Sequence, residues 1–278
     1  MPRLSVPAWL RPWAAWPLVL LAASLLAAPL EAGGAPPWFY RVFRGVRLPN
    51  VSTEDFPKIL SEKFIPAAPE THAKNGLVAY VPALPPRPAP AGTPDEIAIV
   101  CYESEAVYNV ARNTPEGKAY GDLHWQFFDK DKTKSQAAKP FGRSLLEDAP
   151  VDVIGCGIDW QAGHTAVFIG QRQAAIPADQ FLTELTAHVV KARDAFHPQG
   201  LDGYIVVATP DREIAFMHWR AREDLDKALA GPEGKAIAAD AARLMSTVMW
   251  TDAPAFAGKI AYGQAVNVHF QRRPPPGR

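Results

Sequence analysis

The sequence lacks a net charge, and it lacks the short motifs that mark well-known reactions. Its 29 basic and 29 acidic residues balance, whereas a nucleic-acid-binding protein usually carries a basic excess or a basic stripe. The CxxC, CxxCH and HExxH patterns are absent, the histidines are scattered without the spacing of a zinc site, and there is no Ser nucleophile elbow. We therefore predict neither a nucleic-acid partner nor a metal site. These absences leave open whether the chain is an enzyme.

Cysteine is scarce, because the chain contains only Cys101 and Cys156. In an oxidising compartment these two residues could form a disulfide. They could equally be two separate buried thiols, since cysteine often behaves as a small hydrophobic residue. Both alternatives stay open.

One segment near the N-terminus lacks charge. Residues 13–28, WAAWPLVLLAASLLAA, follow Arg3 and Arg11 and precede a run of small residues. This pattern is typical of a secretory signal peptide, and the run is shorter than the about 20 residues of a membrane-spanning helix. We predict a signal peptide over residues 1–34 and an exported protein, periplasmic or secreted, with no stable membrane span after cleavage. The alternative is an uncleaved membrane anchor.

The sequence does contain an internal duplication. The stretch 94–122, PDEIAIVCYESEAVYNVARNTPEGKAYGD, returns as 210–240, PDREIAFMHWRAREDLDKALAGPEGKAIAAD, and Glu96 is separated from Glu213 by 117 positions (213 − 96 = 117). The Pro-Glu-Gly-Lys stretch recurs at the same offset. Earlier in each half, Phe43 matches Phe168 at an offset of 125 (168 − 43 = 125). A unit larger than one strand and one helix has therefore been duplicated.

Each half reads as strand, helix, strand, strand, helix, strand, which is the ferredoxin-like, split βαβ order. The expected strands of the first half lie near 40–48, 77–84, 96–102 and 151–158, and those of the second near 164–173, 201–208, 213–219 and 247–250. We predict an α+β fold of two tandem ferredoxin-like repeats, with these boundaries: 35–158 for the first repeat, including a Pro-rich loop at 82–94; 159–257 for the second; and 258–278 for a C-terminal strand and Pro-rich tail.

This element order, together with the Pro-Glu-Gly-Lys stretch inside each second helix, resembles the dimeric α+β-barrel proteins. That group includes antibiotic-biosynthesis-type monooxygenases and, in tandem form, the chlorite dismutase-like haem proteins. The resemblance covers residues 39–257 and includes no family-specific catalytic motif. It implies that the two repeats pair their sheets into one pseudo-dimeric barrel.

Features that recur in both halves are expected to be structural. They comprise Gly45/Gly170, Arg47/Arg172, Glu96/Glu213 and the Pro-Glu-Gly-Lys stretch, although paired residues in a barrel could also line a shared pocket. In that stretch, proline suits the first position of a helix and glutamate suits the positive end of the helix dipole. We therefore interpret it as the point where a helix restarts.

Residues present in only one half are the better candidates for a site. Tyr108, Arg112, Tyr120 and His124 form two i,i+4 pairs on the second helix of the first half, where the second half has leucine, isoleucine and alanine. This set suits an anionic or aromatic ligand, or acid–base work by His124. The alternative is a polar outer helix face or a protein interface.

The third strands carry the remaining candidates. Cys101 aligns with His218 on one strand face, and Tyr102 aligns with Trp219 on the other. The sequence does not say which face lines a cavity. His218 could bind haem or a metal, or it could be an interior histidine whose nitrogens are already hydrogen-bonded.

Two functions remain in view. The first is an exported protein that binds a small apolar or aromatic ligand, or a protein partner. The second is a barrel-type oxidoreductase, cofactor-free or haem-dependent, that uses His124 or His218. We predict no cofactor, with haem as the alternative. The ligand-binding candidates are Tyr102, Tyr108, Arg112, Tyr120, His124, His218 and Trp219.

Overall fold

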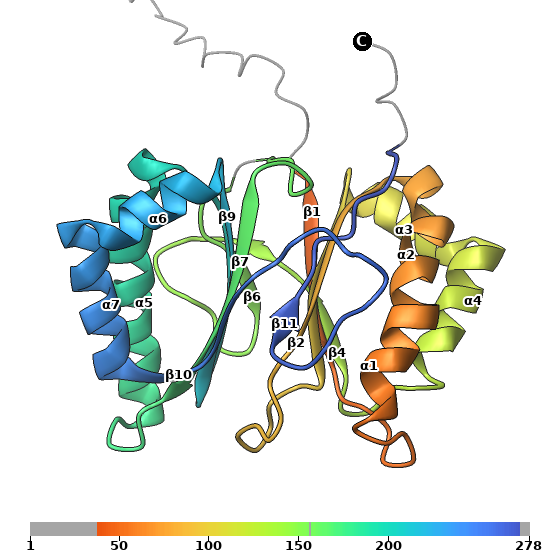
Figure 1. Cartoon of the computed structure of the whole chain (residues 1–278), viewed down its shortest axis with the longest axis horizontal. Helices are drawn as coiled ribbons and strands as arrows, with labels where there is room; N and C mark the ends of the chain where they lie inside the picture. The colour runs from red at the N-terminus through yellow and green to blue at the C-terminus, as the bar shows by residue number, and fades with distance from the viewer. Residues whose placement is uncertain (1–37, 156, 273–278) are drawn as a thin grey trace, which may run out of the picture. The chain divides into compact units, whose positions relative to one another are not determined.

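The computed structural model of the chain describes residues 38–155 and 157–272 (Figure 1). The predicted signal peptide, Cys156 and the end of the Pro-rich tail lie outside these ranges. All the described residues belong to the same unit of the chain. None of the helices within them is long and apolar enough to cross a membrane.

The first repeat forms an antiparallel sheet with the strand order β2-β3-β1-β4, which is the ferredoxin-like order. Its strands are β1 (Phe39–Gly45), β2 (Leu77–Leu84), β3 (Glu96–Tyr102) and β4 (Lys134–Ala137). Its helices are α1 (Asp55–Ile59), a π-helical turn (Leu60–Phe64), α2 (Ile65–His72), α3 (Glu105–Asn113) and α4 (Pro115–His124). Short 3-10 turns end the first helical segments of both repeats, at Ala73–Asn75 and His197–Gln199.

The second repeat has the same topology, with the strand order β8-β9-β7-β10. Its strands are β7 (His164–Arg172), β8 (Leu201–Thr209), β9 (Arg212–Trp219) and β10 (Met245–Asp252). Its helices are α5 (Ala178–Phe196), α6 (Arg222–Ala230) and α7 (Pro232–Leu244). The α+β class and the two tandem ferredoxin-like repeats predicted from the sequence are confirmed.

The two repeats exchange their trailing segments. After β4 the chain forms β5 (Lys139–Pro140) and β6 (Pro150–Asp152), and β6 pairs with β8 of the second sheet. After β10 the chain forms β11 (Gln264–Ala265), which pairs with β2 of the first sheet. Each sheet therefore ends in a strand supplied by the other repeat.

This exchange corrects one expectation. The fourth strand of the first repeat was predicted near 151–158, but it is β4, which pairs with β1, while β6 belongs to the second sheet. The sequence of β4 is Lys-Ser-Gln-Ala, and its first two residues are exposed. An exposed polar edge strand has no apolar alternation to reveal it.

The inner faces of the two sheets share one core. Ile97, Ile99 and Cys101 of β3 lie in the same apolar cluster as Ile214 and Phe216 of β9. The alternate side chains of both strands face the helices, because successive residues in a strand point to opposite faces. Figure 1 shows the helices of each repeat on the outer side of its own sheet.

A π-helical turn explains a change of register in the duplication. Leu60 matches Leu185 at an offset of 125 (185 − 60 = 125), whereas His72 matches Phe196 at an offset of 124 (196 − 72 = 124). The turn Leu60–Phe64 lies between these positions and holds one more residue than an α-helical turn. From the last residue of the turn onward the offset is 124. Phe64 is therefore the counterpart of His188 and Ala68 that of Ala192, and all four of these side chains are buried.

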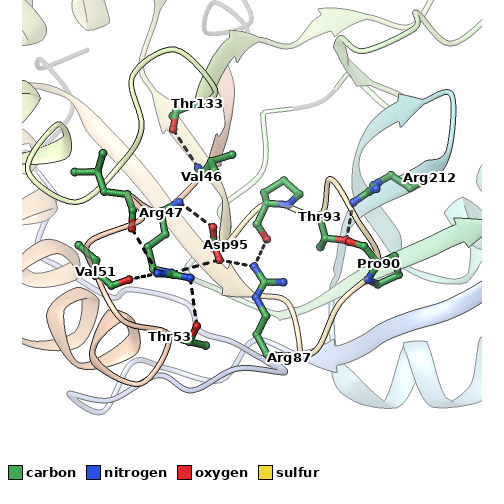
Figure 2. Close-up of polar contacts among 12 residues, drawn as sticks. Val46, Arg47, Val51, Thr53, Arg87, Pro90, Thr93, Asp95, Thr133 and Arg212 are labelled. Atoms are coloured by element: carbon green, nitrogen blue, oxygen red, sulfur yellow. Dashed lines mark hydrogen bonds and ion pairs between the residues drawn. The ribbon is translucent and has the colours of Figure 1, made fainter.

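The Pro-rich loop between β2 and β3 of the first repeat makes contacts with the second repeat. Asp95 accepts hydrogen bonds from the Arg47 backbone N–H (2.8 Å) and from Arg87 Nη2 (2.6 Å), as Figure 2 shows. At the tip of the loop, Arg212 of β9 donates from Nη1 to Thr93 Oγ1 at 2.7 Å. Arg212 also donates from Nη2 to the Ala91 carbonyl at 2.7 Å. The loop is therefore held in place from both sides.

The recurring Pro-Glu-Gly-Lys stretch is a helix restart, as predicted. Pro115 begins α4, and Thr114 caps it by accepting a hydrogen bond from Gly117 N at 3.0 Å. A Cβ atom at Gly117 would collide with the carbonyl oxygen of Ala111, and one at Gly234 would collide with that of Ala228. Glycine recurs because the restarted helix lies directly against the end of the preceding one.

We expect Gly117→Ala and Gly234→Ala each to lower the free energy of unfolding by about 1–3 kcal/mol, since the backbone must shift to admit the methyl group. Urea unfolding measures the loss. Gly121→Ala is the matched control, because it lies in the same helix as Gly117 and a Cβ there meets nothing within 4 Å. Its expected effect is neutral or stabilising, by up to about 1 kcal/mol. Equal effects of all three variants would contradict this role for the two retained glycines.

Candidate functional site

A cavity of about 530 Å³ lies between the helix-facing side of the first sheet and helices α2 and α4. It brings together five of the predicted site residues, and it resolves the question of strand faces: the face of Tyr102 lines the cavity, whereas the face of Cys101 packs between the sheets. The five residues are Tyr102, Tyr108, Arg112, Tyr120 and His124.

The floor of the cavity is a buried Tyr80–Glu96 pair. The Tyr80 hydroxyl donates to Glu96 Oε1 at 3.2 Å, and Glu96 Oε2 has no hydrogen-bond partner among the described residues. Burial raises the pKa of Glu96 to about 8, although the Tyr80 hydrogen bond opposes the rise. At neutral pH the carboxyl group is therefore largely protonated, and a protonated carboxyl can donate one hydrogen bond.

Aromatic rings that pack edge-to-face form one wall of the cavity. The ring centroid of Tyr120 lies 5.1 Å from that of His72 and 4.7 Å from that of His124, and the Phe64 centroid lies 4.3 Å from that of His124. Burial lowers the pKa of both His72 and His124 to about 4. Both imidazoles are therefore neutral at pH 7, and the wall presents flat faces without charge.

The hydrogen bonds of His124 determine its tautomer. His124 Nδ1 lies 2.8 Å from the Tyr120 carbonyl oxygen. Since a carbonyl only accepts, Nδ1 carries the proton in the neutral ring, and Nε2 keeps an unshared electron pair. His72 differs, because its Nδ1 is buried with no hydrogen-bond partner among the described residues.

Positive charge gathers around Tyr108. The Arg41 guanidinium carbon lies 4.6 Å from the Tyr108 ring centroid, and that of Arg112 lies 5.6 Å from it. Ser135 of β4 holds Arg41 through its hydroxyl at 3.3 Å. Arg112 is exposed and Tyr108 is half-buried, so this cationic group lies at the open side of the cavity.

Four lining residues were missed in the sequence. Glu96 recurs as Glu213, and its recurrence was taken as a sign of a structural role; Tyr80, which recurs as Tyr204, was not singled out. Arg41 and His72 are unmatched, since their counterparts are Ala166 and Phe196, and the same test could have found them. The register change at the π-helical turn hid the pairing of His72.

The other two predicted residues lie outside this cavity. His218 is buried, with Nδ1 2.5 Å from Asp202 Oδ1 and Nε2 2.6 Å from the Ala162 carbonyl oxygen. Both ring nitrogens are therefore engaged, which leaves neither for a haem or metal. Trp219 is completely buried on the helix-facing side of the second sheet, 5.5 Å from the Phe196 ring.

Cys101 is buried between the two sheets. Burial raises the pKa of this thiol. Its predicted disulfide partner, Cys156, lies outside the described residues, so the pairing stays a prediction. Among the residues the structure describes, no group of three His, Cys, Asp or Glu side chains is arranged to hold a metal ion.

No family model matches the sequence, and no curated protein matches it. Some solved structures are similar at low identity. A monooxygenase-like protein from Lactobacillus acidophilus NCFM is 8% identical with a TM-score of 0.38, and the match covers 84% of this chain and 100% of that one. A monooxygenase-like protein from Fusobacterium nucleatum subsp. nucleatum is 10% identical with a TM-score of 0.40, covering 77% and 94%. A chlorite dismutase-like protein is 7% identical with a TM-score of 0.34, covering 70% and 84%. Likeness at this level transfers neither an activity nor a site.

Proposed function

We propose that the cavity of the first repeat binds a small, flat aromatic molecule that carries an oxygen at its buried end and a negative charge at its open end. The observation that carries this proposal is the unpartnered Oε2 of the buried Glu96 carboxyl group at the floor of a cavity with ring-lined walls, and a pKa raised to about 8 by burial favours the protonated form of this group at neutral pH. A carbonyl or hydroxyl oxygen of the ligand would accept its hydrogen bond. The N-terminal signal pattern supports the further proposal that this binding protein is exported.

The size and charge of the cavity support the same class of ligand. Its volume of about 530 Å³ falls within the about 300–1,000 Å³ that is usual for small-molecule sites. The rings of Tyr120 and His124 offer aromatic surface to a flat ligand, and aromatic rings pair favourably in offset or edge-on arrangements. Arg41 and Arg112 would attract a carboxylate or phenolate at the mouth.

A binding role is better supported than general-base catalysis. His124 Nε2 could accept a proton from a phenolic substrate, but a pKa of about 4 makes His124 a weak base at neutral pH. General bases work best when their pKa lies near the operating pH. The cofactor-free form of the oxidoreductase alternative therefore depends on a ligand that raises the pKa of His124 on binding.

Haem is the alternative cofactor, and His124 is the residue that fits it. Its neutral imidazole keeps an unshared pair on Nε2, which is the form that binds haem iron, and Arg41 and Arg112 would meet the propionates. Bound haem would supply redox chemistry. A Soret band that forms when haem is added and is lost in His124→Ala would support this alternative, while no band would favour the binding proposal.

The binding proposal is tested with a naphthalene series: 6-hydroxy-2-naphthoate, 2-naphthol and naphthalene. We expect 6-hydroxy-2-naphthoate to bind most tightly by calorimetry, because only this compound has both the oxygen and the charge, at opposite ends of the rings. Arg112→Ala should weaken its binding about tenfold, equivalent to about 1.4 kcal/mol, and leave 2-naphthol unaffected. Since Arg112 is exposed, the free energy of unfolding of the Arg112→Ala variant should differ from that of the unmodified protein by less than about 0.5 kcal/mol.

Arg220→Ala is the control, because Arg220 is an exposed arginine of the second repeat and is not among the residues that line the cavity. Its affinity for 6-hydroxy-2-naphthoate should match that of the unmodified protein. Equal weakening by Arg112→Ala and Arg220→Ala would show a general charge effect. That result, or equal affinity for all three compounds, would contradict the proposed site.

A further inference from the structure

The second repeat contains a cavity of about 540 Å³ at the position equivalent to the first. Six positions of the lining recur at the matching registers of the two repeats: Phe43/Phe168, Ala68/Ala192, Tyr80/Tyr204, Glu96/Glu213, Ala98/Ala215 and Gly117/Gly234. The scaffold of the cavity has therefore been duplicated along with the fold. The remaining lining residues differ, and among the residues that the structure describes the second cavity has fewer aromatic side chains and no arginine or lysine.

The polar floor has been retained. The Tyr204 hydroxyl donates to Glu213 Oε1 at 3.3 Å, and Glu213 Oε2 has no hydrogen-bond partner in the described part of the chain. Glu213 is only 1% exposed, so this unpartnered oxygen is a buried polar group on the floor of a cavity. Leaving such a group without a partner is unfavourable, and a ligand with a hydrogen-bonding head would supply the missing partner.

A histidine adds a second polar group to this floor. His188, the counterpart of Phe64, is 5% exposed, and its Nδ1 lies 3.1 Å from Asp240 Oδ2. Burial raises the pKa of Glu213, and His188 opposes part of that rise. The imidazole therefore lies close enough to the carboxyl group to act on it electrostatically. A head group that can both donate and accept would suit these two neighbours.

The wall formed by the second helix has lost its rings and its arginine. Tyr120, His124 and Trp125 of the first cavity are replaced by Ile237, Ala241 and Ala242, and Arg112 is replaced by Leu229. Of the described residues that line the second cavity, none is lysine or arginine. An anionic head would therefore find no lysine or arginine among these residues, and it would lie beside the Glu213 carboxyl group.

We propose that the second cavity is a separate binding site for a neutral aliphatic alcohol. Its hydroxyl would bond to Glu213 Oε2, and its hydrocarbon chain would fill the space beside Ile237, Ala241 and Leu229. An alcohol fits because its hydroxyl both donates and accepts, and an aliphatic chain fits because the helix wall carries isoleucine, leucine and alanine where the first cavity carries rings. The chain thus holds two cavities of common origin with different ligand classes.

Methionine methyl groups provide the readout. Met217 and Met245 line the second cavity, whereas Met249 is buried in the core between the sheets. With methyl-¹³C methionine, decan-1-ol should shift the Met217 and Met245 signals in a saturable way and leave Met249 unchanged. Decane and decanoate should bind at least tenfold more weakly, because one lacks the hydroxyl and the other carries a charge. Equal binding of decane, or an equal shift of Met249, would overturn the proposal.

Two variants locate the site. Ala241→Phe fills the wall and should weaken decan-1-ol binding at least tenfold, and an unchanged Met249 signal verifies that the variant is folded. Arg112→Ala alters the first cavity only and should leave decan-1-ol binding unchanged, which separates this test from that of the first site. Unchanged affinity for decan-1-ol in a folded Ala241→Phe protein would overturn the assignment. Equal affinity of the unmodified protein for decan-1-ol, decane and decanoate would overturn it as well.

Discussion

Between pH 6.5 and pH 9 the free energy of unfolding is expected to fall by about 2 kcal/mol because of Glu96 alone. Burial raises the pKa of Glu96 to about 8 from 4.5, so the folded state binds more protons than the unfolded state in this range. Stability that depends on a raised carboxyl pKa is lost as pH rises through the folded value. Urea unfolding across this pH range measures the fall.

The two cavity histidines act in the opposite direction, at lower pH. Burial lowers the pKa of His72 and His124 to about 4 from 6.5. Their contribution to stability therefore rises with pH up to about 6.5, and above that pH the effect of Glu96 is no longer opposed by them. We expect maximum stability near neutral or slightly acidic pH.

Glu96→Gln separates the contribution of Glu96, since the amide keeps an acceptor for Tyr80 and carries no titratable proton. The variant should lose about 2 kcal/mol of the pH dependence and be the more stable protein at pH 9. Glu213→Gln is the matched variant in the second repeat, where burial also raises the carboxyl pKa. An unchanged slope in both variants would mean that neither carboxyl is protonated at neutral pH.

Trp160→Ala is expected to lower the free energy of unfolding by about 3–5 kcal/mol, the range for removing a large buried ring. Trp160 is completely buried in the core shared by the two sheets. Its Nε1 donates to the Tyr40 hydroxyl at 3.2 Å, and its carbonyl oxygen accepts from Asn267 Nδ2. The ring also lies edge-on to His218, with 5.4 Å between centroids. The side chain of Trp160 therefore joins β1 and β9, and its backbone carbonyl joins the C-terminal segment.

Trp250→Ala is the control for this experiment, because Trp250 is 43% exposed and its replacement should cost much less. Trp160→Phe should lie between the two, since it keeps most of the ring and loses the indole N–H. Calorimetric or urea unfolding distinguishes the three. Similar losses for Trp160→Ala and Trp250→Ala would contradict the central role of Trp160 in the core.

The fold was predictable where apolar patterns recur. The strands β1, β2, β3, β7, β8 and β9 have apolar runs that recur between the two halves, and these six strands and β10 were expected from the sequence. The strand β4 was not, because its polar residues form an exposed edge. The pairing of β6 with β8 could not be predicted either, since it depends on contacts between the two repeats and not on local sequence.

The site was predictable from differences between the repeats, but only in part. Tyr108, Arg112, Tyr120 and His124 were found because the second half has aliphatic residues in their places. The floor residue Glu96 was set aside because it recurs, yet it lines the cavity together with Tyr80, which also recurs. Recurrence failed as a test because the cavity itself is duplicated, so a retained residue can belong to two sites.

The exchange of trailing segments has a consequence for what can fold alone. The strand β11 covers the edge of β2, and β6 covers the edge of β8. A polypeptide ending after β10 would expose the first of these edges, and one beginning at β7 would expose the second. Uncovered edges promote pairing with other chains and aggregation. The repeat is therefore a unit of sequence only, and the smallest piece that closes both of its sheets spans the two repeats together with the segment after β10.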